Sequence, residues 1–185
     1  MSFDSTKHGL RTPEKARCDE EGERWFSILI QPIVKQHDGV IYSRLHHSWL
    51  CNTELGDLDI FISLPSGKNF ATSVKSLIGS SPKVFYHSKK QGFCYRKQNG
   101  GIKKYPVEPT LGLVERVEWL AVNKQDFFGK TPIKILAFSH PIVLYCHEET
   151  PVKEIGDRSF VFINDVWCVD ERQILTLLTK LIEEK

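Results

Sequence analysis

The sequence predicts an α/β domain built from a mixed β-sheet flanked by helices, and three observations lead to this fold class. Apolar residues recur at helical spacing over residues 12–36, 109–122 and 171–183. Short segments bounded by Gly, Pro, Asn or Asp lie between these helices and are typical of strands. The order is a helix, three strands, a basic insert, a helix, four strands and a last helix, which favours a mixed sheet with helices packed on it.

The three expected helices have recognisable starts or apolar stripes. Thr12-Pro13-Glu14 offers a capping side chain, a proline in the first turn and an acid near the positive end of the helix dipole. Pro109 opens the second helix, and Asp170 caps the third. The inward stripes of the first and last helices are Phe26, Leu29, Ile30, Ile33 and Val34, and Ile174, Leu177, Leu178 and Leu181.

Turn residues separate the expected strands. Asp38-Gly39 precedes the first strand, Pro65-Ser66-Gly67-Lys68 joins the second to the third, and Asn99-Gly100-Gly101 and Asn164-Asp165 close two further hairpins. The expected strands are residues 40–45, 58–64, 70–77, 83–86, 93–97, 102–105, 133–138, 143–145, 160–163 and 167–169.

Length and composition are those of one globular domain. The chain has 185 residues, 41% of them hydrophobic and 26% charged, so we expect residues 12–185 to fold together and residues 1–11 to be disordered. The chain lacks an apolar run of about 18 residues and an apolar N-terminal signal, so we expect a cytoplasmic protein with no membrane partner. Five widely spaced cysteines favour reduced thiols over a disulfide framework or a zinc site.

Charge is distributed unevenly along the chain, although the formal net charge is only +2. Residues 60–107 contain nine Lys or Arg and no Asp or Glu, which predicts a basic face that binds phosphates. Solvated surface lysines on hairpins are the alternative. The candidate nucleic-acid-binding residues are Lys83, Lys89, Lys90, Arg96, Lys97, Lys103 and Lys104.

Three polar residues on the second and third strands form a candidate catalytic group. Ser73 and Lys75 are two residues apart on one strand and so share a face, and a short turn pairs that strand with the one that carries Asp59. A carboxylate so placed can bind a divalent metal that activates water, while a lysine stabilises charge at a scissile phosphate. A surface salt bridge between Asp59 and Lys75 is the alternative.

Several short motifs along residues 22–145 resemble those of the nuclease-related domain (NERD) of the PD-(D/E)xK superfamily. They are Gly22-Glu23, Gly56-Asp57-Leu58-Asp59, Pro65-Ser66-Gly67, Ser73-Val74-Lys75 and Glu108-Pro109-Thr110-Leu111-Gly112. The resemblance implies a restriction-endonuclease-like fold and a nuclease that uses Mg²⁺ or Mn²⁺.

Two positions depart from the family pattern. Ser73 stands where the family has a metal-binding Glu, and Gly112 stands where it often has Gln. Some restriction enzymes with Ser-Val-Lys in this place take the missing carboxylate from a neighbouring helix. Glu115, one turn after Gly112, is the first candidate for a metal ligand beside Asp59, and Glu23 in the first helix is the second. For either residue, a solvated or rim position is the alternative.

These observations lead to metal-dependent hydrolysis of DNA phosphodiester bonds as the expected function. Asp59 with Glu115 or Glu23 would hold Mg²⁺ or Mn²⁺, Lys75 would stabilise the developing charge, and the basic insert would follow the DNA backbone. The alternative is a catalytically silent nucleic-acid-binding or scaffold domain with the same fold. A protein-interaction module with an acidic partner is the third hypothesis. The sequence leaves the oligomeric state open.

Overall fold

A computed structural model of the chain describes residues 13–51, 55–76, 83–96, 99–105, 108–124, 131–139 and 141–184. Residues 1–11, Thr12 and Lys97, for which the sequence makes predictions, lie outside these ranges. Within them are the α-helices α1 (Pro13–Gln36), α2 (Pro109–Asn123) and α4 (Glu171–Glu183). These helices match the three helices that periodicity predicts. Asp170 caps α4 as expected, because its Oδ1 accepts a hydrogen bond of 3.0 Å from the backbone N of Arg172.

The strands and two short 3-10 turns form the rest of the regular structure. The strands are β1 (Val40–Ser43), β2 (Ile60–Ser63), β3 (Asn69–Lys75), β4 (Lys83–His87), β5 (Gly92–Arg96), β6 (Ile102–Lys104), β7 (Ile133–Phe138), β8 (Val143–Tyr145), β9 (Val152–Ile155), β10 (Arg158–Ile163) and β11 (Val166–Asp170). The 3-10 turns are η2 (Ser48–Leu50) and η3 (Ser88–Lys90).

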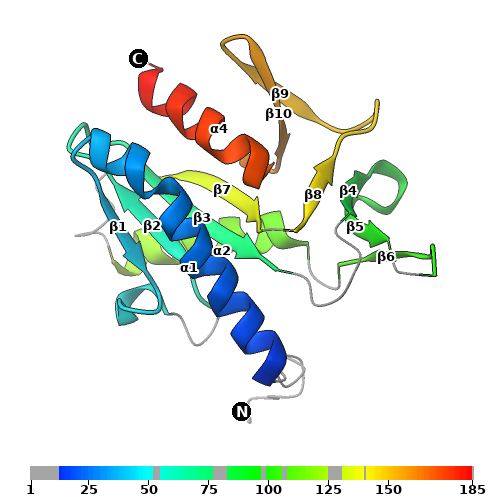
Figure 1. Cartoon of the computed structure of the whole chain (residues 1–185), viewed down its shortest axis with the longest axis horizontal. Coiled ribbons are helices and arrows are strands. Elements are labelled where there is room, and N and C mark those ends of the chain that lie inside the picture. Colours follow the sequence, from blue (N-terminus) through cyan, green and yellow to red (C-terminus); the bar gives the residue numbers. More distant parts are fainter. Residues whose placement is uncertain are drawn as a thin grey trace.

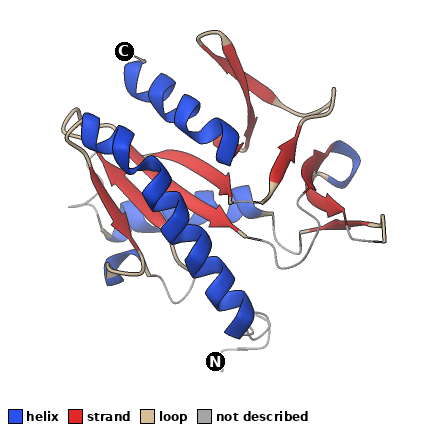
Figure 2. Ribbon diagram, viewed as in Figure 1, coloured by secondary structure: helices blue, strands red, loops and turns tan. Residues whose placement is uncertain are grey.

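Two sheets organise these strands (Figures 1 and 2). The main sheet has the strand order β1-β2-β3-β7-β11-β10-β9 and is mixed, because β3, β7 and β11 run parallel whereas the other pairs are antiparallel. The second sheet, which we call the basic sheet, has the order β6-β5-β4-β8. The mixed sheet flanked by helices is thus confirmed.

Helices cover the two faces of the main sheet. α1 and α4 cross its near face in Figure 1, and α2 lies behind it. Strand alternation divides the core accordingly: Ile60 and Ile62 of β2 pack with α1 and α4, whereas Phe61 packs on the side of α2 with Leu113 and Val117. Among the described residues, no helix is long and apolar enough to cross a membrane.

The structure adds to the prediction at two strands. β9 was not predicted, because it is mostly exposed and VKEI has little apolar alternation. β8 was predicted as a strand without a partner, and it pairs with β4 in the basic sheet. The Asp170 carboxylate accepts a hydrogen bond of 2.8 Å from the backbone N of Leu144, which ties β8 to the end of β11. The strands of the basic insert therefore form a second sheet together with β8.

Candidate functional site

Asp59 and Ser73 meet at one end of the main sheet. β2 and β3 pair with Ile60 opposite Thr72, so the residue before Ile60 falls beside Ser73. The Asp59 Oδ2 accepts hydrogen bonds from Ser73 Oγ at 3.0 Å and from the backbone N of Val74 at 2.7 Å. Lys75 follows Ser73 by two residues and projects from the same face of β3. The alternation of these strands thus assembles the group that the sequence suggests.

Arg44, just after β1, joins the Asp59 group to two other carboxylates. Its Nε and Nη2 donate hydrogen bonds to both oxygens of Glu23 at 2.6–3.0 Å. Its Nη1 donates to Asp57 Oδ2 at 3.1 Å, and its Nε lies 3.4 Å from Asp59 Oδ1. One guanidinium therefore contacts three carboxylates from two parts of the chain, and its contact with Glu23 is bidentate, as arginine geometry favours.

Gly22 explains how α1 brings Glu23 to this place. A Cβ atom added at Gly22 would lie only 2.3 Å from Ser76 Oγ and 3.0 Å from Ser139 Oγ. These two hydroxyls, at the ends of β3 and β7, are hydrogen-bonded to each other at 2.9 Å. Only a glycine lets the helix approach the strand ends so closely, and the next residue is Glu23. The Gly22-Glu23 motif therefore has a direct structural reason.

Burial sets the electrostatics of this site. Glu23 is only 1% exposed, and burial raises the pKa of its carboxyl group from its ordinary value of 4.5 to about 7, against the lowering effect of the Arg44 hydrogen bond. The negative charge of Asp59 acts in the same direction as burial. For Arg44, burial lowers the pKa, but the hydrogen bond and charge of Glu23 and the charge of Asp59 outweigh it, so the pKa lies above its ordinary value.

A second guanidinium, that of Arg116, reaches the site from α2. Its Nη2 donates a long hydrogen bond of 3.5 Å to Ser73 Oγ, and no described residue accepts one from its buried Nε. A Cβ atom added at Gly112 would lie 3.4 Å from Arg116 Nη1. Burial lowers the pKa of Arg116, and the nearby charges of Asp59 and Asp57 oppose that shift. Gly112, where the family often has Gln, thus leaves room for a cation.

The acids of this site do not fit a Mg²⁺ centre as they are arranged. Both oxygens of Glu23 are bound by Arg44, and both oxygens of Asp59 have protein partners. A magnesium ion is usually bound through one or two carboxylates, whose oxygens must be free to coordinate it. In the described part of the chain, no group of three or more Asp, Glu, His or Cys side chains is arranged to hold a metal ion. The cation at the centre of this acidic group is Arg44 itself.

Glu115, the first candidate for the second metal ligand, has an exposed side chain on α2. Its role as a ligand beside Asp59 stays a prediction. The next residue is Arg116. The helical spacing places both residues on one broad face, and the structure shows a contact with Ser73 for Arg116. Glu23, the other candidate, does lie at the site.

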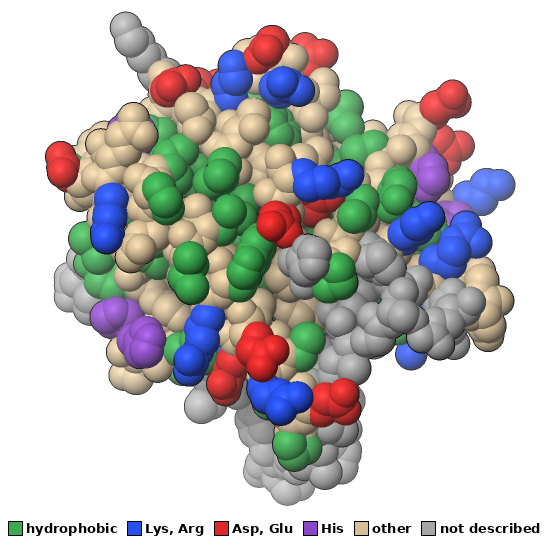
Figure 3. All heavy atoms as spheres, viewed as in Figure 1, with side chains coloured by type: hydrophobic (Ala, Val, Ile, Leu, Met, Phe, Trp, Pro, Cys, Tyr) green, Lys and Arg blue, Asp and Glu red, His purple; other side chains and the backbone are tan. Residues whose placement is uncertain are grey.

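The basic stretch is divided between the two sheets. Lys68 does not belong to a phosphate-binding face, because its Nζ donates to the last carbonyls of α4, at 2.8 Å to Leu181 O. The exposed basic residues of the candidate set belong to the basic sheet and to η3. They are Lys83, Lys89, Lys90, Arg96, Lys103 and Lys104. Figure 3 shows Lys, Arg and His side chains gathered on the side of the molecule where Figure 1 shows β4, β5 and β6.

Sequence reasoning missed Arg44 and Arg116 and gave Asp57 no role. Asp57 belongs to the quoted Gly56-Asp57-Leu58-Asp59 motif, so the motif itself could have indicated it. Arg116 shares the helical face that was assigned to Glu115 and Gly112. Arg44 gives no signal in the sequence, because its partner Glu23 lies 21 residues away in another element. Comparisons with protein-family models, with curated proteins and with solved structures gave no match to this chain.

Proposed function

We propose that this protein is a DNA-binding domain of the restriction-endonuclease-like kind. In its acidic site, an arginine side chain occupies the place of a metal ion. The observation that carries the proposal is the position of the Arg44 guanidinium among Glu23, Asp57 and Asp59. The residues of the NERD-like motifs, Glu23, Asp59 and Ser73, meet there, which supports the fold assignment. With Ser73 in place of a Glu and Arg44 among the acids, the site is neutralised by the chain's own cations.

The basic sheet would supply the affinity for DNA. Its four strands contain no Asp or Glu, and Lys83, Arg96 and Lys103 are exposed on them. The Nζ of Lys104 donates to the backbone carbonyls of Lys90 and Gln91. Lys and Arg side chains that contact phosphates release bound counterions, so binding of this kind weakens steeply with salt. Phosphate contacts give affinity without reading sequence.

Metal-dependent DNA hydrolysis is the second candidate, and one observation favours it. The carboxylates of Glu23 and Asp59 both approach the same Arg44 Nε, so the two acids are close enough to share one ion. Lys75 projects from the same face of β3 as Ser73. This function requires that Arg44 withdraw and that Mg²⁺ or Mn²⁺ replace it.

One pair of assays on the full-length protein separates the two functions. Fluorescence anisotropy measures the binding of a labelled duplex at several salt concentrations, with and without Mg²⁺, and a supercoiled plasmid reports nicking with Mg²⁺ or Mn²⁺. We expect binding that weakens with salt, no dependence on Mg²⁺ and no nicking. The charge reversal Lys35→Glu, in the last turn of α1, serves as the control for net charge.

Either of two outcomes overturns the proposal. Failure to bind DNA at low salt contradicts DNA binding itself. Nicking that is abolished by both Asp59→Asn and Lys75→Ala, in proteins whose circular dichroism is unchanged, establishes the nuclease instead. Nicking that survives both substitutions points to a contaminating enzyme, and repurification must then remove it for the proposal to stand.

A further inference from the structure

The basic sheet has one face packed on the core, and part of its outer face lines a pocket. Val84, Phe93 and Leu144 belong to the hydrophobic cluster shared with α2. Phe85 alternates with Val84 on β4, so its ring lies on the opposite, outer face of the sheet. It belongs to neither of the two large hydrophobic clusters, although only 9% of it is exposed. The strand register sets residues of the neighbouring strands on this outer face too: Tyr145 opposite Phe85, and Ile102 opposite Arg96.

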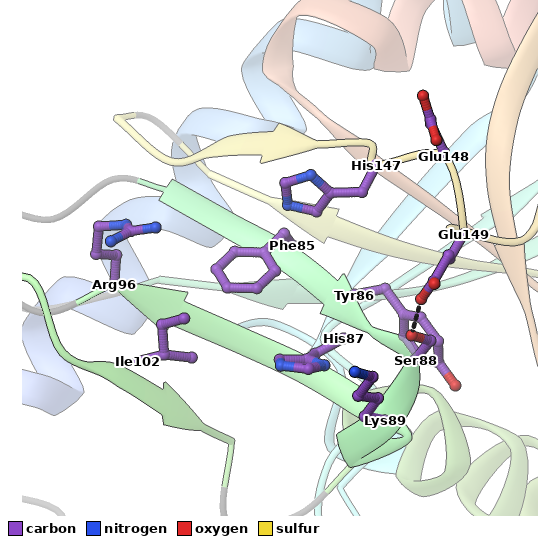
Figure 4. Close-up of a pocket in the computed structure, with 10 residues that line it drawn as sticks. All are labelled: Phe85, Tyr86, His87, Ser88, Lys89, Arg96, Ile102, His147, Glu148 and Glu149. Atoms are coloured by element: carbon purple, nitrogen blue, oxygen red, sulfur yellow. Dashed lines mark hydrogen bonds between the residues drawn. The ribbon is translucent and has the colours of Figure 1, made fainter.

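A pocket of about 700 Å³ opens on the outer face. Phe85 lies in the middle of the pocket in Figure 4, with the rings of His147 and His87 on either side. The His147 ring meets the Phe85 ring edge-on, with 5.2 Å between the ring centroids. The centroid of the His87 ring lies 6.3 Å from that of Phe85, and the two ring planes are tilted by 33°. Ile102, 40% exposed, adds an apolar wall. A flat aromatic ligand bound in this pocket would contact the rings of Phe85, His87 and His147.

Cations surround this pocket, and the acids lie at one end. Arg96 lies at one end in Figure 4, and Lys89 lines the pocket near His87. Glu148 and Glu149 line the end opposite Arg96, and Glu149 accepts a hydrogen bond from Ser88 Oγ. A ligand with an aromatic part and negative phosphates would therefore place its phosphates toward Arg96, away from these acids.

We infer that the outer face of the basic sheet binds single-stranded DNA, with an unpaired base in the pocket against Phe85 and phosphates beside Arg96. Sheets that carry exposed aromatic and basic side chains bind single strands in this way, because every base has a face that can stack. The bases of a duplex stack on one another, so they cannot enter such a pocket without being flipped out. This inference rests on the proposed function and names the form of its substrate.

A binding assay with matched oligonucleotides tests the role of the bases. Fluorescence anisotropy on the full-length protein compares a labelled oligothymidylate of about 12 nucleotides, within the usual site size, with the same strand carrying abasic residues in its centre. The abasic strand keeps every phosphate and loses only bases. We expect it to bind about fivefold or more weakly, because stacking on an aromatic residue contributes substantially to each base bound. The matching duplex should also bind more weakly than the single strand.

Three variants and one control test the pocket. Phe85→Leu keeps an apolar side chain in the sheet but removes the ring, and His147→Ala removes an exposed wall. Both should weaken binding of oligothymidylate about fivefold or more and leave the abasic strand nearly unaffected. Arg96→Glu should weaken both strands. The control Lys35→Glu should change neither, and circular dichroism checks that each variant is folded.

Each remaining outcome overturns a distinct statement. Equal affinity for the oligothymidylate, the abasic strand and the duplex refutes the base pocket, while the proposed DNA binding stands. Normal affinity in folded His147→Ala, or in Phe85→Leu and Arg96→Glu, places the binding face elsewhere. Tighter binding of the matching oligouridylate refutes the assignment to DNA. Binding of no nucleic acid at all refutes the inference and the proposed function together.

Discussion

The two polar regions of this molecule solve opposite electrostatic problems. At the end of the main sheet, the carboxylates of Glu23 and Asp59 are buried, and the guanidinium of Arg44 forms ion pairs with both from within the chain. On the basic sheet, Lys83 and Arg96 are exposed and the strands carry no acid to neutralise them. The acids of the main sheet already have a cationic partner in the chain, whereas the cations of the basic sheet are exposed to solvent. We therefore assign the binding of an anionic ligand to the basic sheet.

The largest expected effect comes from removing the internal cation. Arg44→Ala leaves Glu23 and Asp59 buried without their cationic partner, so the free energy of unfolding should fall by about 3–5 kcal/mol. Urea denaturation followed by circular dichroism measures this change. The matched substitution Arg96→Ala, at an exposed position of the basic sheet, should change it by less than about 0.5 kcal/mol. A loss below about 1 kcal/mol for Arg44→Ala would contradict an essential internal ion pair.

The pH dependence of stability should come from the same buried site. Burial raises the pKa of Glu23 from 4.5 to about 7, so between these values the folded chain binds more protons at Glu23 than the unfolded chain does. Raising the pH through this window therefore lowers the free energy of unfolding that this group contributes. Glu23→Gln should remove that part of the slope. A difference between wild type and Glu23→Gln that stays constant from pH 4.5 to 7 would show that Glu23 does not titrate there.

A divalent cation should partly replace Arg44 if that side chain occupies the place of an ion. In Arg44→Ala, about 10 mM Mg²⁺ should raise the free energy of unfolding by about 1.4 kcal/mol, the gain expected for a site with a dissociation constant near 1 mM. Wild type should gain nothing, because Arg44 engages the carboxylate oxygens. The same measurement in Arg44→Ala with Asp59→Asn is the control. A similar gain in all three proteins would assign the effect to non-specific binding.

The smallest effect, on the basic sheet, is expected in the salt dependence of DNA binding. Arg96→Glu should reduce the magnitude of the negative slope of log K against log salt concentration by about 1, since about one phosphate contact is lost. Stability should be almost unchanged, in contrast to Arg44→Ala. The control Lys35→Glu has the same change in net charge and should keep the wild-type slope. Equal slopes for Arg96→Glu and wild type would remove Arg96 from the DNA-binding face.

Local patterns were sufficient for most elements and for one part of the site. Helical periodicity and the Asp170 cap predicted α1, α2 and α4, and strand alternation predicted that Ser73 and Lys75 share a face. The Asn164-Asp165 turn was also predictable, and both residues adopt the positive φ of 52° and 60° that such tight hairpins need. These features depend on residues close together in the chain, where spacing alone fixes the geometry.

Contacts between distant elements were not predictable in the same way. The contact of Arg116 with Ser73 depends on how α2 packs against the sheet, which helical spacing does not specify. β8 belongs to the basic sheet because its pairing with β4 and its bond to Asp170 outweigh its position in the sequence. Periodicity predicts which side chains share a face of a helix or strand, but it does not predict which other element packs against that face.

The sequence by itself determined the α/β class, the helices and the shared face of Ser73 and Lys75, because residue spacing sets which side chains project together. Only the tertiary structure decided what the acidic site contains. The close approach at Gly22 brings Glu23 to the strand ends, and there it meets Arg44 rather than a free carboxylate partner. Local patterns specify candidate ligands, whereas the charge that occupies the space between them depends on which distant segments fold together.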